Sequence, residues 1–221
     1  MRYEKGYGAE MSARIVEYAS ARIRERGIES IKVDGLMKAA GLTRGGFYFH
    51  FQSRRDLIER AFARAVDESV EKWQKIADRS SPGERLLGIV DYYLTERHRV
   101  DIGHGCALPS LGAEVPRAGA GTKKTFSNGL REMIEVLSQD MHGPSNRKAA
   151  SIVSELVGAL LLARAVDHPQ FASEILSAAR ESVLGADPQA PKVSKRKRKS
   201  SPRIERLGSK SARRREKSKQ L

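Results

Sequence analysis

The sequence predicts an all-α protein with two helical domains followed by a basic tail. Apolar residues recur at helical spacing along nearly the whole chain, and no segment alternates polar and apolar residues as a half-buried strand would. Glycine, proline or aspartate stands between the helical segments. We therefore expect an N-terminal helix-turn-helix domain at residues 1–60, a second helical domain at 61–186 and a disordered tail at 187–221.

Start and stop signals place the N-terminal elements. The first helix is expected from about Ser12 to Arg26, and Gly27 is typical of a helix end. Two short helices follow, over Val33–Ala40 and from Thr43 to about Phe51, with a tight turn at Gly41 between them. This order of elements is that of a helix-turn-helix unit.

The next helix begins with a capping box. Ser53 can cap it and Asp56 stands three residues later, so we expect a helix that runs to about Asp78. The run Ser81-Pro82-Gly83-Glu84 has the composition of another helix start, with a cap, a proline at the first helical position and a glutamate. The remaining helices are expected at 82–98, 106–114, 118–140, 145–166 and 169–184, with a glycine-containing loop over Val100–Gly105.

Charge is distributed unevenly along the chain. The whole sequence holds 41 Lys and Arg against 27 Asp and Glu, a formal net charge of +14. Residues 187–221 hold 14 basic and 3 acidic side chains, whereas residues 61–186 hold 15 and 16. A segment so charged and so poor in apolar residues is expected to be disordered. The excess of cations predicts a polyanion among the partners.

Composition excludes several classes of protein. No stretch approaches the roughly 20 apolar residues that cross a bilayer, and the N-terminus lacks the apolar region of a secretory signal. The single cysteine, Cys106, can form no internal disulfide. We find no activated nucleophile, no carboxylate pair and no phosphate-binding glycine loop. The sequence thus predicts a cytoplasmic protein that is not an enzyme and needs no cofactor or metal.

The segment that carries chemistry is Lys32–Phe51. A helix-turn-helix presents its second helix to the major groove of DNA, which is wide enough to admit it. Thr43 would cap that helix, Arg44 lies in its first turn, and Tyr48 and His50 offer hydrogen-bond donors to phosphates, although His50 could instead pack at the domain edge. Gly45 and Gly46 lower helix stability but let the backbone come close to DNA.

The run AAGLTRGGFYFHF at Ala39–Phe51, followed by Arg54–Leu57, resembles the N-terminal signature of the tetracycline-repressor (TetR) family. That family consists of dimeric, ligand-responsive transcriptional regulators, mostly repressors. The resemblance covers about residues 12–62, and a weaker similarity to the effector domain of many members covers about 93–115. It implies recognition-helix contacts from Thr43, Arg44 and Gly46, phosphate contacts from Tyr48 and His50, and a place near the DNA backbone for Arg55.

Two positions depart from the family. Members usually have a small residue where this chain has Met37, and usually Thr or Ser where it has Lys32, which can still meet a phosphate. The resemblance further implies a homodimer through the last two helices, a pseudo-palindromic operator and a mainly apolar pocket for a small-molecule effector before about residue 144. Two alternatives remain open: an architectural protein that binds DNA non-specifically through its tail, and a small-molecule-binding or enzymatic helical protein.

Several residues have two interpretations. Phe47, Phe49 and Phe51 are interpreted as core rather than as base-stacking groups. Cys106 could be a sensor thiol, because a helix N-terminus lowers a thiol pKa, but we favour a buried, inert cysteine. His98, Asp101 and His104 could join Cys106 around a metal, yet their spacing matches no standard zinc site, so a solvated loop is the preferred interpretation.

Overall fold

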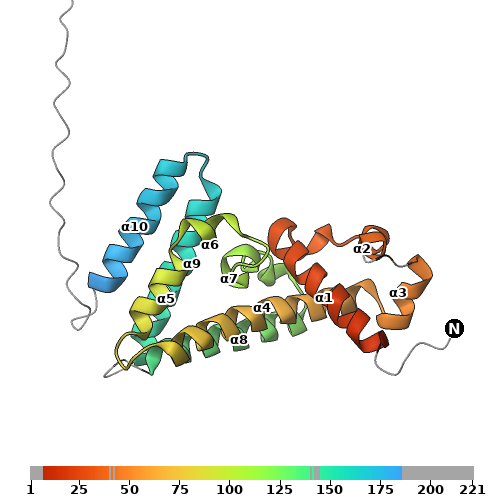
Figure 1. Ribbon diagram of the computed structural model, residues 1–221, viewed down its shortest axis with the longest axis horizontal. Coiled ribbons are helices and arrows are strands. Elements are labelled where there is room, and N and C mark those ends of the chain that lie inside the picture. Colours follow the sequence, from red (N-terminus) through yellow and green to blue (C-terminus); the bar gives the residue numbers. More distant parts are fainter. Residues whose placement is uncertain (1–6, 40, 42, 140, 142–144, 186–221) are drawn as a thin grey trace, which may run out of the picture. The chain divides into compact units, whose positions relative to one another are not determined.

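The protein is described by a computed structural model that covers residues 7–39, 41, 43–139, 141 and 145–185, all within one compact unit. No strand occurs among these residues, and the all-α prediction is confirmed (Figure 1). The N-terminal helix-turn-helix and the helical region after it are both present. The basic tail predicted at 187–221 lies outside the described residues.

The helix-turn-helix has the predicted elements with small shifts at their ends. Its helices are α1 (Tyr7–Arg26), α2 (Val33–Ala39) and α3 (Arg44–His50), and a short 3₁₀ turn, η1 (Ile28–Ser30), lies between α1 and α2. Gly27 ends α1 at φ 82°, and the turn between α2 and α3 has Gly41 at φ 71°. Both angles lie in the left-handed region that glycine adopts without strain.

α4 (Arg54–Arg79) starts at the predicted capping box. The Ser53 hydroxyl accepts a hydrogen bond from the Asp56 N–H at 3.1 Å. The Asp56 carboxylate in turn accepts from the Gln52 N–H at 3.0 Å. These bonds satisfy N–H groups that a helix start would otherwise leave without partners.

The single helix predicted at 82–98 is wrong. The structure has α5 (Arg85–Tyr93) and α6 (Glu96–Val100) in its place. Gly83 stands at φ 84°, so Ser81–Glu84 forms a turn and not the first turn of a helix. After α5 ends, the Thr95 hydroxyl accepts from the His98 N–H at 3.1 Å and starts a new helix.

The remaining elements follow the predicted order. The segment predicted as one helix at 106–114 is shorter, α7 (Ala107–Leu111), and is followed by the 3₁₀ turn η2 (Val115–Arg117). Three long helices complete the described chain: α8 (Ala120–Ser138), α9 (Ser145–Ala165) and α10 (Pro169–Gly185). α8 lies along α4, and α9 packs between α8 and α10 (Figure 1).

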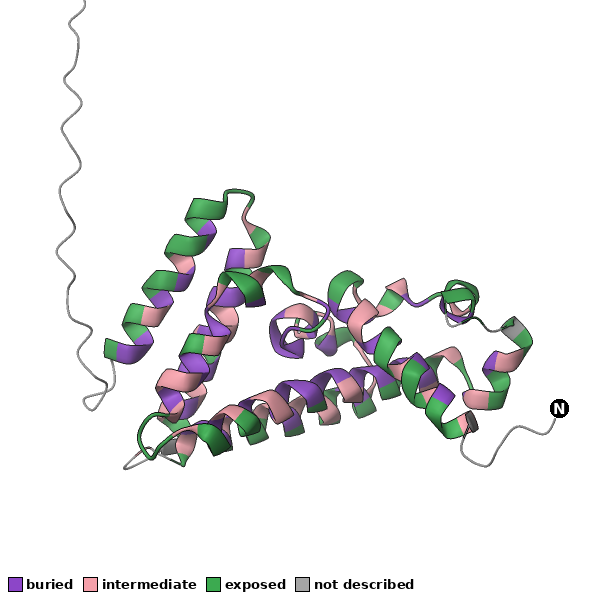
Figure 2. Ribbon diagram, in the orientation of Figure 1, coloured by how far each residue is buried: buried purple, intermediate pink, exposed green. Residues whose placement is uncertain are grey.

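The buried side chains form two hydrophobic clusters. The first joins α1, α2, α3 and the first half of α4 with three residues from farther along the chain, Ala107, Leu111 and Val115. The second joins the rest of α4 with α5, α8, α9 and α10. Buried residues recur along the length of α4 (Figure 2). The helix belongs to both clusters, because its buried residues up to Val66 lie in the first and those from Val70 on lie in the second. This helix, together with α7, therefore connects the helix-turn-helix to the rest of the fold.

Candidate nucleic-acid interface

Two buried phenylalanines hold α3 against the scaffold. Phe47 and Phe51 are 1% and 2% exposed, and their ring centroids are 5.4 Å apart. From α2 they meet Leu36 and Met37, which are also buried in the same cluster. Met37 lies beside Gly46, where a Cβ would stand at an ordinary contact distance of 3.8 Å from the Met37 methyl group.

Phe49 does not belong to the core, and the expectation that all three phenylalanines are buried is wrong. Its side chain is 80% exposed. A helix turns about 100° per residue, so Phe51 returns to within roughly 40° of Phe47 whereas Phe49 points about 160° away from it. The same rule places Gly45 on the outer side of α3, and Tyr48 on its flank, where it is 70% exposed.

The structure brings Thr43, Gly45, Gly46 and Tyr48 together on one short helix. Thr43 occupies the N-cap position of α3, but its hydroxyl makes no capping hydrogen bond. A Cβ added at Gly45 would meet nothing within 4 Å, so no other part of the described chain packs against the helix at this position. Arg44 is the first residue of α3, and its side chain lies outside what the structure describes.

Three other predicted contact residues lie at the end of α3 or on neighbouring elements. Lys32 is exposed just before α2, and its carbonyl accepts the Leu36 N–H at 3.0 Å. The His50 Nδ1 lies 3.0 Å from the Ser12 hydroxyl of α1, so His50 ties α3 to α1. Arg55 is exposed in the first turn of α4, but its Nε donates to the Glu59 carboxylate at 2.9 Å. Of these three residues, His50 and Arg55 thus already have partners within the chain.

A buried charge cluster, which the sequence analysis missed, lies between α1 and α4. The Arg24 side chain is fully buried, and its Nη1 lies 2.5 Å from the Glu68 carboxylate. The same nitrogen donates to the Gly105 carbonyl at 3.5 Å, in the loop before α7. Arg64 adds contacts to Glu17, Glu68 and Glu71. Burial raises the pKa of Glu68, and its hydrogen bond with Glu17 raises it further.

A second link joins the connection between α1 and α2 to a later part of the chain. The Glu114 carboxylate accepts a hydrogen bond from the Ile28 N–H at 3.0 Å. A Cβ at Gly27 would stand 3.0 Å from the same carboxylate. The helix-turn-helix is therefore attached to the region around α7 by a polar contact as well as by the Arg24 cluster.

The structure favours the inert interpretation of Cys106. The residue is 3% exposed, and burial raises the pKa of its thiol, the opposite of what an activated sensor thiol needs. His98 is also buried: its Nδ1 donates to the Tyr93 carbonyl at 2.9 Å, and its Nε2 accepts from the Cys106 N–H at 2.9 Å. Burial lowers the pKa of His98 to about 4, so the ring is neutral at pH 7.

The candidate metal ligands His98, Asp101, His104 and Cys106 do not come together around a common point. Both ring nitrogens of His98 are used in hydrogen bonds, and His104 pairs instead with Asp101 at 2.9 Å. Among the described residues, no group of three His, Cys, Asp or Glu side chains could hold a metal ion. None of the described helices is long and apolar enough to span a membrane.

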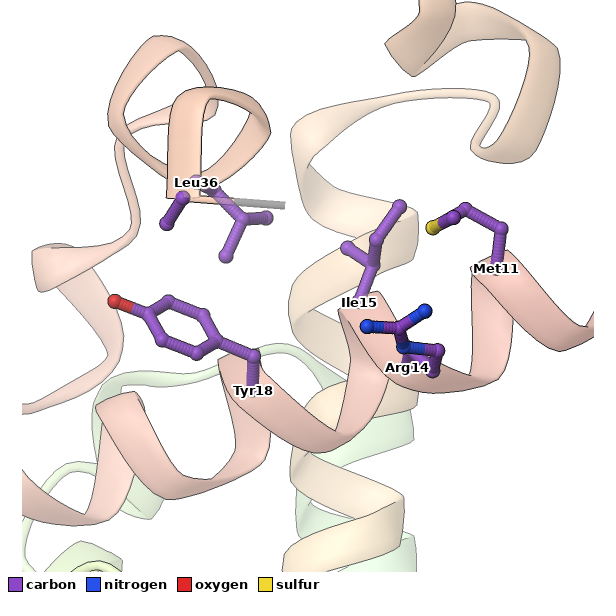
Figure 3. A pocket seen from close by; sticks show the side chains of 6 residues that line it. Met11, Arg14, Ile15, Tyr18 and Leu36 are labelled. Atoms are coloured by element: carbon purple, nitrogen blue, oxygen red, sulfur yellow. The ribbon is translucent and has the colours of Figure 1, made fainter. Parts of the chain in front are cut away.

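A small pocket of about 130 Å³ lies between α1 and α2. Figure 3 shows Met11, Ile15 and Tyr18 projecting from α1 and Leu36 from α2; Arg14 and Ala39 complete the lining. Pockets for drug-sized ligands usually measure about 300–1,000 Å³. This pocket is thus a gap in helix packing, and the larger effector cavity expected before residue 144 stays a prediction.

Comparison with known sequences matches the helix-turn-helix. Residues 15–61 match the family described as "Bacterial regulatory proteins, tetR family". The HTH-type transcriptional repressor KstR2 of Mycobacterium tuberculosis is 26% identical over 91 residues, 40% of this chain and 46% of that protein. The HTH-type transcriptional regulator YfiR of Bacillus subtilis is 27% identical over 79 residues, 36% and 38% of the two chains. The chain thus spans less than half the length of these curated relatives.

Comparison with solved structures extends to most of the fold. A TetR transcriptional regulator from Chloroflexus aurantiacus superposes with a TM-score of 0.70 at 21% identity, over 81% of this chain and 94% of that one. The reduced form of Escherichia coli NemR gives a TM-score of 0.67 at 20% identity, over 80% and 96%. At these identities the likeness concerns the fold, which the two structures share with this chain beyond the helix-turn-helix.

Proposed function

The chain is a TetR-family transcriptional regulator, and we propose that it is a repressor that binds a pseudo-palindromic operator as a homodimer. We propose further that it is cytoplasmic and not an enzyme, and that it leaves the operator when a small molecule binds. The outer side of α3 carries this proposal. Two buried phenylalanines fix the helix, while Gly45, Gly46 and Tyr48 face outward or flank that side. Each protomer would place α3 in a major groove, with half-sites roughly 34–36 Å apart.

Replacing Tyr48 or Arg44 with alanine should weaken operator binding at least about fivefold, since one lost contact costs about 1–3 kcal/mol. Tyr48 is 70% exposed, so its loss should leave the melting temperature unchanged. The operator is first enriched from a pool of randomised duplexes with the full-length protein, and binding is then measured by fluorescence anisotropy. Tyr18→Ala, a matched exposed tyrosine on α1, should bind like wild type; unchanged binding by Tyr48→Ala and Arg44→Ala would contradict the assignment of α3.

Deleting residues 187–221 should lower the salt dependence of binding without changing the preferred sequence. The tail holds 14 basic residues, and each phosphate neutralised contributes about −0.9 to the slope of log K against log salt. Phosphate contacts position a protein on DNA but do not specify a sequence. Affinity titrations from roughly 50 to 200 mM salt test this. Loss of sequence preference in the truncated protein would contradict this prediction. Equal affinity of the full-length protein for operator and random DNA would favour the architectural alternative.

A homodimer through α9 and α10 is proposed from their exposed apolar residues. Leu161, Leu162 and Phe171 are 40%, 54% and 52% exposed near the turn that joins these helices. A Cβ at Gly158, also on α9, would meet nothing within 4 Å, so another helix can approach closely there. Large apolar residues exposed together on a helix pair are typical of a partner interface.

Leu162→Glu should therefore convert the dimer to a monomer and reduce operator binding by more than tenfold, because a monomer engages one half-site only. Light scattering after gel filtration gives the mass. Val100→Glu is the matched control: Val100 is 60% exposed at the end of α6, outside both helices. If the Leu162→Glu variant is still a dimer, the proposal that α9 forms part of the dimer interface is contradicted.

For the effector we propose a largely apolar molecule that carries a hydrogen-bond acceptor. Trp73 and Tyr93 are fully buried, with ring centroids 5.6 Å apart. Within the described residues the Trp73 Nε1 and the Tyr93 hydroxyl have no hydrogen-bonded oxygen or nitrogen partner, and the hydroxyl lies beside the Cys106 thiol. Buried donors of this kind are usually satisfied. An effector that binds there would act on DNA binding through α4 and α7, which contact both clusters, by favouring one of two states.

A further inference from the structure

The exposed Phe49 is the large apolar side chain on the outer side of α3. It is 80% exposed, more than any other large hydrophobic residue among those the structure describes. Its Cε1 edge lies 3.3 Å from where a Cβ of Gly8 would stand, and the ring meets His50 edge-to-face at 5.2 Å. The ring thus lies beside Gly8 and His50, and most of its surface is open.

The neighbours of Phe49 on α3 give it unobstructed access to whatever lies outside the helix. The residues one turn before it are Gly45 and Gly46, which have no side chains, and a Cβ at Gly45 would meet nothing within 4 Å. Because positions four apart lie on the same face of a helix, Gly45 and Phe49 form its outermost line. The backbone can thus come close to a surface into which only Phe49 projects along that line.

The floor of the major groove offers one apolar group, the 5-methyl group of thymine; the remaining base edges present hydrogen-bond donors and acceptors. A phenylalanine can make no hydrogen bond, so it gains free energy in the groove only by covering that methyl group. Building on the proposed operator binding, we propose that Phe49 selects thymine at one position of each half-site by packing on its 5-methyl group.

The test compares thymine with uracil, which lacks only the methyl group. The duplex is the one that full-length protein enriches from a randomised pool, and each thymidine is replaced in turn by deoxyuridine at symmetric places in both half-sites. At one position we expect a loss of about fourfold per half-site for wild type, the value of one buried methyl group. For Phe49→Ala the ratio between the dT and dU duplexes should fall to about one at that position, while the other bases stay selected.

Tyr18→Ala, 49% exposed on α1, is the matched aromatic control and should keep the wild-type ratio. If no duplex is enriched over random DNA, operator binding itself fails. If a duplex is enriched but no dU substitution weakens wild type, or Phe49→Ala keeps the ratio, only the role of Phe49 is overturned. A lower melting temperature of Phe49→Ala would place the ring in packing within the chain, and a changed oligomeric state would place it between copies; either result also overturns the proposal.

Discussion

Replacing Gly45 with alanine should make the protein more stable and yet a much weaker operator binder. Glycine in a helix is destabilising by roughly 0.5–1 kcal/mol relative to alanine, and a Cβ at this position meets nothing within 4 Å in the free protein. Unfolding in urea should therefore show a gain of that size. Bound to DNA, the same methyl group would lie between α3 and the base edges. Overpacking of a close contact costs about 1–3 kcal/mol, so affinity should fall at least about fivefold.

Gly35→Ala is the matched control for the prediction that Gly45→Ala raises stability while it weakens operator binding. Gly35 is exposed within α2, and a Cβ there also meets nothing within 4 Å. Both substitutions should therefore raise the free energy of unfolding, but only Gly45→Ala should weaken binding by more than about twofold. Equal affinities of the two variants would mean that α3 does not approach the bases through its glycine side. Equal losses would mean that the effect is not specific to that side.

Local signals in the sequence predicted most of the helices. The glycines at 27 and 41 end α1 and α2 in the left-handed conformation, and the Ser53 box starts α4. The prediction failed between residues 82 and 98, because two weak signals compete there. Gly83 has the conformational freedom to form a turn, and the Thr95 hydroxyl caps a new helix. Apolar periodicity does not register a break of two residues inside an otherwise helical segment.

The outer side of α3 was predicted only in part. Composition pointed to aromatic core residues, whereas the 100° step between helical residues separates Phe49 from Phe47 and Phe51. That signal was present in the sequence. The pairing of Arg55 with Glu59 was readable too, because the two residues stand four apart on α4. The partners of His50 and Arg24 were not readable, because Ser12 lies on α1 and Glu68 on α4, and no single sequence specifies how these helices pack.

Replacing Arg24 with methionine should destabilise the protein more than any other single substitution considered for this fold. Its guanidinium lies 2.5 Å from the Glu68 carboxylate, and both side chains are nearly or fully buried. Removal of one partner of a buried ion pair usually costs about 3–5 kcal/mol, and the partly exposed Arg64, 3.1 Å from Glu68, offsets only part of the lost charge interaction. Arg26→Met, at the exposed end of α1, should change stability by no more than about 0.5 kcal/mol. Urea unfolding followed by circular dichroism at neutral pH gives both values.

The loss in Arg24→Met should depend on pH in a direction that identifies its cause. Burial and Glu17 already raise the pKa of Glu68, and Arg24 is the group that lowers it, so the substitution raises that pKa further. A carboxyl group with a raised folded-state pKa contributes stability below its unfolded value, near 4.5, and loses it as the pH rises through the folded value. The penalty should thus be largest at neutral pH and shrink as the pH falls through the raised pKa of Glu68, because the protonated side chain carries no charge.

A second variant separates the charge from the packing of the Arg24 side chain. Glu68→Gln in the Arg24→Met background removes the carboxylate that has lost Arg24 while keeping nearly the same shape. It should recover most of the lost stability at neutral pH and abolish the pH dependence of the difference. A pH-independent loss that Glu68→Gln does not restore would show that Arg24 acts through its methylene groups. In that case the helix-turn-helix would be joined to α4 and the loop before α7 by apolar contacts, and the ion pair would be incidental to the fold.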